Sequence, residues 1–445
     1  MTERSLWKTR LGFILASAGS AVGLGAIWKF PYMAGTNGGS VFMLPYVFFS
    51  VTIGLALLIG EMCMGRGARK GAMGAYKVLG GGRARIFGPI SVLTGFLVLA
   101  FYSVVGGWTV YYFFQALIGN GVIDDPAQMK AVFGAFASSG AAPVAAHLVF
   151  LASTALVVYF GVQNGIERVS KVLMPLLFVM MIVLIVRGLT LPGAMEGVKF
   201  LFKPDMSAFS GESLLNAMGF AFFSLSVGSA SQMNYGSYLS DRVHLPSSVS
   251  WIVFLAIMSA VLGGLMIMPA VFAFGLTPDA GPGLTFATMP AVFSKLPFGH
   301  AFSIAFYACL FVAALTSSIS IFEMSVQCLC DEWHFTRPRA VALAGIVLAV
   351  LGTLCALGFG PLADVRIFGR TFFDFFDYLT SNIGMPLGVI GISLVSAWLA
   401  WPVTRRQLCL VKPMSEAWLK GYRIIAGIFA PVLIVVVMLK GLGLF

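Results

Sequence analysis

Apolar stretches of about 20 residues recur from one end of this chain to the other, and this feature decides what the chain can fold into. Hydrophobic residues make up 59% of the 445 residues and charged residues only 10%. In a soluble domain about a quarter of the residues are charged. Inside a bilayer only helices and closed barrels satisfy every backbone polar group, and stretches of this length suit helices. The sequence therefore predicts an all-α membrane protein that crosses the bilayer many times.

Eleven transmembrane helices are predicted from the apolar runs between charged or turn-rich breaks. They cover residues 11–33, 40–64, 87–118, 144–160, 171–188, 212–239, 248–274, 298–330, 339–359, 373–401 and 421–441. With a cytoplasmic N-terminus, 19 of the 28 Lys and Arg residues fall on the inner side, as the positive-inside rule requires. We therefore expect a multi-pass protein of the plasma (inner) membrane, surrounded by the lipid bilayer. The basic residues follow this topology, so no nucleic-acid partner is expected.

Two of these spans contain sequences that hold a continuous helix poorly. The first span has three glycines in AGSAVGLGAIWKFP, and the sixth has SLSVGSAS, which is crowded with hydroxyls around Gly228. The two spans are five apart, so they open two five-helix halves of opposite orientation, at about 8–188 and 212–401. Broken helices at matching positions of inverted repeats point to a substrate and ion site near the midplane. Close helix packing through small residues is the alternative explanation.

Six stretches of the sequence form recognisable motifs: RLGFILASAGSAVGLG (10–25), FPYMAGTNGGSVFMLPY (30–46), EMCMGR (61–66), NGIERVSKVLMPLLF (164–178), FFSLSVG (222–228) and LTSSISI (315–321). With these motifs the chain resembles the neurotransmitter:sodium symporters, and most closely their bacterial amino-acid transporters. The similarity extends from the N-terminus to about residue 401. It implies one transporter domain over residues 1–445, with a five-plus-five inverted repeat, broken helices 1 and 6, and an extra helix at 421–441.

The resemblance implies one sodium site between the first and eighth helices. The matching positions are Gly19, Val22, Ala313, Thr316 and Ser317. Oxygen ligands without a carboxylate suit a monovalent cation. The Thr316 and Ser317 hydroxyls would otherwise bond back to carbonyls of their own helix.

The family's other sodium site and its chloride site are incomplete in this sequence. At the other sodium site, Ala26 and Leu255 stand where side-chain oxygens are expected, and only Ser224 keeps one. The chloride site keeps hydroxyls at Tyr46, Ser224 and Ser259, but Phe220 and Leu255 replace its amides. We therefore expect one sodium ion as the coupled ion and no chloride.

A substrate pocket is implied at the two breaks. The matching positions are Ala21, Leu24, Gly25, Val98, Tyr102, Phe223, Ser224, Ser226, Ser229, Ser317 and Ile321. The N–H groups of Leu24 and Gly25, with the Tyr102 hydroxyl, would meet an acidic group, because a helix start carries partial positive charge. Carbonyls nearby would meet an ammonium group, so the expected partner is a small zwitterion. The hydroxyls and the space at Ser229 favour a polar or larger substrate.

Charged residues in and beside the spans match the gates of the family. Lys29 and Asp377 match the outer gate pair, with Lys in place of the usual Arg, so the gate should be looser or differently bridged. At the inner gate, the matching positions are Arg4, Asp331, Trp7 and Tyr238.

Two carboxylates within the spans need a partner or water. Glu61 is expected to accept hydrogen bonds from the unwound sixth helix. Glu323 has no such counterpart and is expected to face the inner vestibule as a solvated group, with proton coupling as the alternative role.

These features predict a sodium-coupled secondary active symporter that imports an amino acid or amino-acid-like zwitterion by alternating access. A proton-coupled transporter on the same scaffold, with Glu323 or Lys29 titrating, is one alternative. A non-transporting amino-acid sensor is another, although the inner loops are too short for an output segment. An enzyme is not expected, because no catalytic cluster or phosphate loop is found. The protein is expected to be a monomer or a homodimer.

Overall fold

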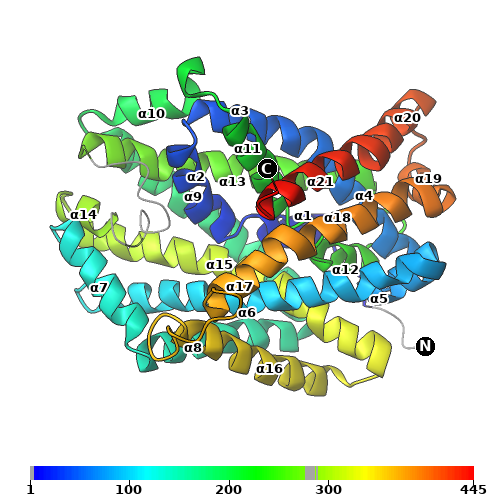
Figure 1. Cartoon of the computed structure of the whole chain (residues 1–445), viewed down its shortest axis with the longest axis horizontal. Helices are drawn as coiled ribbons and strands as arrows, with labels where there is room; N and C mark the ends of the chain where they lie inside the picture. Colours follow the sequence, from blue (N-terminus) through cyan, green and yellow to red (C-terminus); the bar gives the residue numbers. More distant parts are fainter. Residues whose placement is uncertain (1–4, 276–285, 287–288, 445) are drawn as a thin grey trace.

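Helices make up every regular element in the part of the chain that the computed structural model describes, which is residues 5–275, 286 and 289–444 (Figure 1). Short π-helical or 3-10 turns join several of the helices. The α-helices are α1 (Arg10–Ala21), α2 (Phe30–Thr36), α3 (Ser40–Phe49), α4 (Leu55–Ala68), α5 (Ala72–Ala75), α6 (Phe87–Leu117), α7 (Pro126–Ser138), α8 (Ala141–Tyr159), α9 (Arg168–Leu189), α10 (Ala194–Phe202), α11 (Gly211–Ser224), α12 (Ser231–Ser237), α13 (Leu245–Ala273), α14 (Met289–Ser294), α15 (Gly299–Trp333), α16 (Arg337–Leu357), α17 (Phe372–Leu379), α18 (Met385–Leu394), α19 (Trp401–Cys409), α20 (Glu416–Ile424) and α21 (Ala430–Gly441). The predicted all-α fold is confirmed.

Nine helical stretches in the described residues are long and apolar enough to cross a membrane. A tenth is the bent pair Arg10–Ala21 and Gly25–Thr36, whose two parts meet at 46°. The predicted span 212–239 is divided into α11 and α12, of 14 and 7 residues, and neither piece alone has the length of a span. The count of eleven therefore stays a prediction.

The first break separates α1 from a π-helical turn, η1 (Gly25–Lys29), that leads into α2. Thr9 begins α1 by accepting a hydrogen bond from the Gly12 N–H at 3.0 Å, as an N-cap residue does. The helix ends at Ala21, where Val22 adopts φ −90° and ψ 56°. Gly23 follows, and a Cβ atom there would lie 2.2 Å from the Ser317 Oγ. The glycine is therefore required for the close approach of α15.

The second break lies between α11 and α12. Within six residues the backbone takes a positive φ at Ser226 (54°), Gly228 (87°) and Ala230 (65°), so no helix can continue. Glu61 of α4 accepts hydrogen bonds from the backbone N–H groups of Gly228 and Met233 at 3.3 and 3.2 Å. The expected role of Glu61 is thereby confirmed. Its carboxylate accepts from backbone N–H groups that the break leaves without helical partners.

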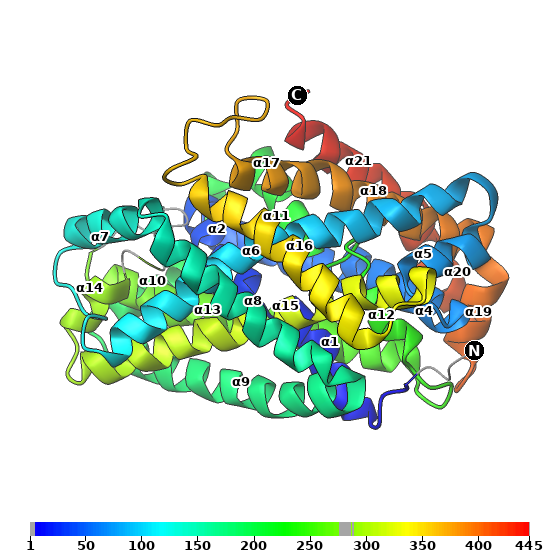
Figure 2. The same cartoon turned by 90° about the horizontal axis from the view of Figure 1, so that it is seen from below.

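Helix α15 lies at the centre of the bundle and packs against α1, α6, α8, α9, α12 and α16 (Figures 1 and 2). In its most apolar stretch 78% of the residues are buried, against 17% for Glu416–Gly441, which runs along the outside of the bundle. Helices α1 and α12, which flank the two breaks, both contact α15, so the two breaks lie beside the same central helix.

Candidate functional site

A small cavity, of about 40 Å³, lies between the two breaks and α15. It is lined by Ser20, Ala21, Gly23, Gly25, Val98, Tyr102, Phe223, Ser224, Ser226, Ser229, Ser317, Ile321 and Met385. Ten of the eleven predicted substrate positions are among these residues. The eleventh, Leu24, donates its backbone N–H to the Tyr102 hydroxyl at 3.2 Å. The structure thus brings the predicted set together, and its role in binding stays a prediction.

Three lining residues were missed by the sequence analysis as pocket residues. Ser20 and Gly23 belong to the broken stretch already singled out, so their place could have been expected. Met385 comes from α18, and the only local signal is the sequence Gly384-Met385-Pro386, which follows a π-helical turn.

Ser317 joins the breaks to the central helix. Its hydroxyl oxygen lies 3.0 Å from both the Gly19 and the Ser20 carbonyl oxygens, so it donates to backbone groups that the end of α1 leaves free. Ser226 of the second break donates to the same Ser20 carbonyl at 3.1 Å. One carbonyl therefore meets hydroxyls from α15 and from the unwound segment after α11.

The five predicted sodium ligands lie at the contact of α1 with α15. The Thr316 hydroxyl donates to the Ala313 carbonyl at 3.0 Å, and a Cβ atom on Gly19 would lie 3.1 Å from the Thr316 Cβ. Val22 and Ala313 are fully buried. Carbonyl and hydroxyl oxygens without a carboxylate are the donor set expected for a monovalent cation. No group of three or more His, Cys, Asp or Glu suited to a metal occurs in residues 5–275, 286 and 289–444.

At the positions expected for the other ions, Phe220 packs in an aromatic cluster, and Ala26 and Leu255 have aliphatic side chains. The Phe220 ring centre lies 5.1 Å from that of Tyr46 and 5.9 Å from that of Phe30. The Ser224 hydroxyl donates to Tyr46 and to a carbonyl of its own helix, and Ser259 also bonds within its own helix. Leu255 is partly exposed. These contacts leave a hydrophobic cluster in place of the missing amides.

A second, outer cavity of about 270 Å³ is separated from the central one by two side chains, since Phe223 and Met385 line both cavities. The Lys29 ammonium lies over the Phe223 ring, 4.1 Å from its centre. Asp377 accepts a hydrogen bond from Ser381 at 2.9 Å. The ion pairs found among the described residues do not include Lys29 with Asp377, so the predicted outer gate is not closed by a direct ion pair in this structure.

Near the C-terminal end of α15, Trp7 is held by α12 and the residue that follows it. The Trp7 indole donates to the Tyr235 carbonyl and the Trp7 N–H donates to the Tyr238 carbonyl, both at 3.1 Å. Asp331 accepts hydrogen bonds from the Gly71 N–H and from Gln327. Arg4, the predicted partner of Asp331, lies outside the described residues.

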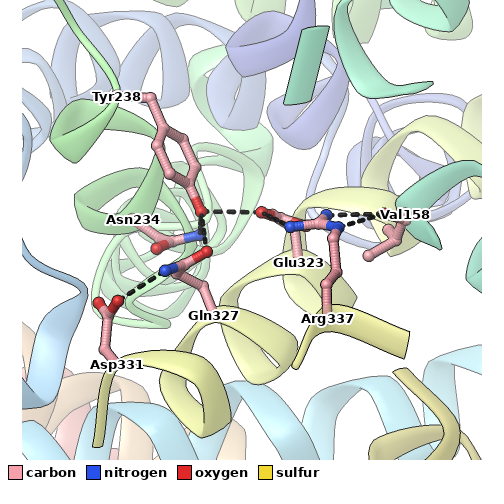
Figure 3. A network of polar contacts seen from close by, with 7 residues as sticks. All are labelled: Val158, Asn234, Tyr238, Glu323, Gln327, Asp331 and Arg337. Atoms are coloured by element: carbon pink, nitrogen blue, oxygen red, sulfur yellow. Dashed lines mark hydrogen bonds and ion pairs between the residues drawn. The ribbon is translucent and has the colours of Figure 1, made fainter. Parts of the chain in front are cut away.

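Glu323 is the centre of a buried polar network (Figure 3). It forms an ion pair with Arg337, the first residue of α16, and accepts a hydrogen bond from the Tyr238 hydroxyl at 2.8 Å. Arg337 also donates to the Val158 carbonyl at the end of α8. The expectation that Glu323 is a solvated group is wrong: its side chain is fully buried, because α16 turns back over the end of α15 and brings Arg337 onto it. No local sequence pattern identifies this partner, 14 residues away.

Comparison with known proteins places these features in one family. A sequence model described as the Sodium:neurotransmitter symporter family matches residues 4–122 and 130–443. The chain is 46% identical over 389 residues to an uncharacterized sodium-dependent transporter of Bacillus subtilis, covering 87% of this chain and 86% of that protein. It is 33% identical to another from Haemophilus influenzae, covering 99% and 98%. The crystal structure of MhsT in complex with L-phenylalanine superposes with a TM-score of 0.91 at 37% identity, covering 98% of this chain and 100% of that one.

Proposed function

The chain belongs to the sodium:neurotransmitter symporter family, and on that premise we propose that it imports an amino acid or amino-acid-like zwitterion together with one sodium ion by alternating access. The observation that carries the proposal is the position of Ser317. Its hydroxyl contacts the Gly19 and Ser20 carbonyls, and its side chain also lines the central cavity. The proposed ion site and substrate site therefore share a residue.

Sharing Ser317 gives a physical route for coupling. In this structure its hydroxyl proton is directed at backbone oxygens of α1. A sodium ion bound to those carbonyl oxygens would instead be coordinated by the lone pairs of the Ser317 hydroxyl oxygen, so the hydroxyl proton would have to turn away. Ion binding would therefore reorient a hydroxyl group in the wall of the cavity. A ligand shifts a conformational equilibrium only by its difference in affinity for the two states. A hydroxyl that serves both sites makes the affinity for substrate depend on the ion, and the reverse follows by linkage.

The zwitterion is supported by the polar groups around the cavity. The Leu24 N–H and the Tyr102 hydroxyl lie together at the start of η1, where a helix start favours a carboxylate or another acidic group. The Ser20 carbonyl and its hydroxyl neighbours lie on the opposite side of the break and suit an ammonium group. MhsT was solved with L-phenylalanine, so an amino acid with a large side chain is a reasonable first substrate to test.

A ratio of one sodium ion per substrate is supported by the side chains at the other ion positions. Ala26, at the other sodium position, is fully buried and has no side-chain oxygen, and Phe220, at the chloride position, packs against Tyr46 and Phe30. A cation moved into such surroundings loses its hydration without gaining oxygen ligands, which is strongly unfavourable. The same argument applies to chloride, which would meet ring carbons where the amide donors are missing.

Proton coupling through Glu323 is not supported by the geometry. Its carboxylate is fully buried and bonded to Arg337 and Tyr238, and it does not line the central cavity in which coupling is proposed. We therefore assign Glu323 to the buried polar network of Figure 3 rather than to ion coupling.

The test is uptake into proteoliposomes of a labelled panel of amino acids and taurine. An inward sodium gradient is compared with a proton gradient at the same membrane potential. We expect uptake of at least one panel member with sodium only. Uptake that is driven equally by protons without sodium would contradict the proposal.

A double variant tests the proposed sodium site in the same uptake assay. Thr316→Val with Ser317→Ala removes two side-chain oxygen ligands. Hydrogen bonds to charged groups contribute about 1.5–3 kcal/mol each, so the half-saturating sodium concentration should rise by at least about a hundredfold. Ser318→Ala is the matched control, because the Ser318 hydroxyl bonds to Leu315 and Thr154 on the other side of α15. Equal loss in the control would show that the effect is structural.

A further inference from the structure

An apolar groove of about 370 Å³ lies on the outside of the bundle, where α6, α15 and α16 meet. We refer to it as the α6–α16 groove. Its wall includes Pro89, Leu93, Phe96, Trp333, Leu343 and Val347. Leu93, Trp333, Leu343 and Val347 are exposed large hydrophobic residues of the isolated chain. The groove is separate from the central and outer cavities, with which it shares no residue.

One end of the groove reaches the face of the protein at which α1 begins. The starts of α6 and α16 and the end of α15 are all on this side, at the right of Figure 2. Trp333 is the last residue of α15 and is 55% exposed. An exposed tryptophan at the end of a membrane span is typical of the interface between hydrocarbon and water. The groove therefore runs from this interface into the hydrocarbon layer.

Two arginines come shortly before the groove residues in the sequence, Arg85 in the 3-10 turn that leads into α6 and Arg339 in the first turn of α16. Arg85 is four residues before Pro89 and eight before Leu93, and Arg339 is four before Leu343 and eight before Val347. Residues four apart lie on the same face of an α-helix, so Arg339 continues the α16 wall of the groove by one turn toward the interface, and Arg85 lies in the turn that leads directly into the α6 wall. A long basic side chain at a helix end reaches the headgroup layer while its stem stays on apolar surface.

Both arginines are exposed, and neither has an acidic partner among the residues that the structure describes. Arg85 donates only to the Gly82 carbonyl in the turn that precedes α6. The nearby Lys77, in contrast, is paired with Glu332. Two uncompensated guanidinium groups above an apolar groove match a ligand with a negative head and a hydrocarbon tail.

We propose that the α6–α16 groove binds a phospholipid with a net negative headgroup. One acyl chain lies along Leu93, Phe96 and Val347, and the phosphate is held by Arg85 and Arg339. Guanidinium groups bind phosphate through paired, charge-assisted hydrogen bonds. A phosphatidylcholine headgroup also contains a phosphate, but its own ammonium group opposes two unpaired arginines. The site therefore selects anionic over zwitterionic lipids.

Lipid binding in the α6–α16 groove has a consequence for the buried polar network around Glu323. Helix α15 contributes Trp333 to the groove and, further along its length, Glu323 to the ion pair with Arg337 at the start of α16. A lipid bound between α6 and α16 holds the start of α16 against α15. We therefore expect the anionic lipid to stabilise the folded protein more than phosphatidylcholine does.

The test is native mass spectrometry of the purified full chain with defined amounts of palmitoyl-oleoyl phosphatidylglycerol or phosphatidylcholine. The variant Arg85→Gln with Arg339→Gln removes both charges. Each basic residue near the surface contributes about one factor of five in affinity, so phosphatidylglycerol should bind about thirtyfold more weakly. Phosphatidylcholine binding should be unchanged.

Two further variants keep the test decisive. Arg168→Gln with Arg406→Gln makes the same change of net charge with exposed arginines that do not precede a groove residue by one or two helical turns, and it should leave binding unchanged. Leu93→Trp fills the groove, keeps both arginines and should also weaken phosphatidylglycerol binding. Equal affinity for the two lipids, equal loss in the control, or a dimer that covers the groove and excludes phosphatidylglycerol would overturn the proposal.

Discussion

Removing either partner of the buried ion pair between Glu323 and Arg337 should have unequal effects on stability. The Glu323 side chain is fully buried, whereas that of Arg337 is 25% exposed and also bonds to the Val158 carbonyl. Arg337→Gln leaves a buried carboxylate with the Tyr238 hydroxyl as its remaining donor. A buried charge without its partner costs about 3–5 kcal/mol.

Glu323→Gln should cost less than Arg337→Gln. The glutamine oxygen can still accept from Tyr238, and Arg337 keeps both its carbonyl partner and contact with water. A loss of about 1–3 kcal/mol is expected, which is the range for a hydrogen bond to a charged group. In the double variant no buried charge is left alone, so the protein should be more stable than Arg337→Gln by about 1–2 kcal/mol.

Thermal unfolding of the four purified proteins in the same detergent measures the order of stability. The expected order is wild type, then Glu323→Gln, then the double variant, with Arg337→Gln the least stable. Glu212→Gln is the control, because the pair between Glu212 and Lys440 is 3.5 Å long and the Glu212 side chain is 74% exposed, so its loss should cost less than about 1 kcal/mol. A double variant less stable than Arg337→Gln would refute the reasoning.

Uptake by Glu323→Gln separates the structural role from proton coupling. The neutral side chain cannot release a proton, yet sodium-driven uptake should continue and should keep its pH dependence. Complete loss of uptake in a variant that is still folded would show that Glu323 takes part in coupling.

Three further predictions follow from the breaks and from one helix end. Gly228→Ala should abolish uptake and lower the unfolding temperature, since φ is +87° and a Cβ atom would lie 2.6 Å from a carbonyl oxygen of α18. Gly275→Ala, at φ +64° and with no described residue within 4 Å of the added Cβ, should cost only about 1–2 kcal/mol. Tyr102→Phe should raise the KM for substrate about tenfold, because the lost hydroxyl meets the Leu24 N–H in the cavity, and the unpaired N–H should also lower stability. An unchanged KM would exclude Tyr102 from the carboxylate site. His244 caps α13 through its ring nitrogen, and its pKa is lowered below the usual 6.5 by burial and by nearby arginines and a lysine. Folding stability should therefore fall as the pH drops below about 6.5, because the unfolded chain binds the proton more readily. His244→Asn should reduce that pH dependence in thermal unfolding.

The spans could be predicted from the sequence because hydrophobicity over 20 residues is a local property. The two breaks could be predicted as well, since glycines and hydroxyl residues weaken a helix wherever it packs. The division of 212–239 into α11 and α12 follows from Ser226, Gly228 and Ala230, whose positive φ values no hydropathy pattern reveals. The positions around the cavity came from the resemblance to a family, because composition and spacing alone do not bring residues 98, 223 and 317 together.

Partners that depend on helix rotation could not be predicted. Lys29 lies over Phe223 rather than beside Asp377, because η1 turns its ammonium toward the ring at the boundary of the two cavities. Glu323 was assigned to solvent because its partner, Arg337, belongs to the next helix and reaches back across the connecting turn. Met385 enters the cavity from α18 through the packing of that helix against α6.

The breaks are stable in a membrane because neighbouring side chains take up the backbone groups that they set free. Ser317 takes the Gly19 and Ser20 carbonyls, Tyr102 takes the Leu24 N–H, and Glu61 takes two N–H groups beyond the second break. An unsatisfied group at this depth costs several kcal/mol. Of these partners, Ser317 and Tyr102 line the cavity, whereas Glu61 does not. In the proposed mechanism, ion and substrate therefore replace the bonds of Ser317 and Tyr102 to the first break, while the Glu61 bonds keep the second break in place throughout the transport cycle.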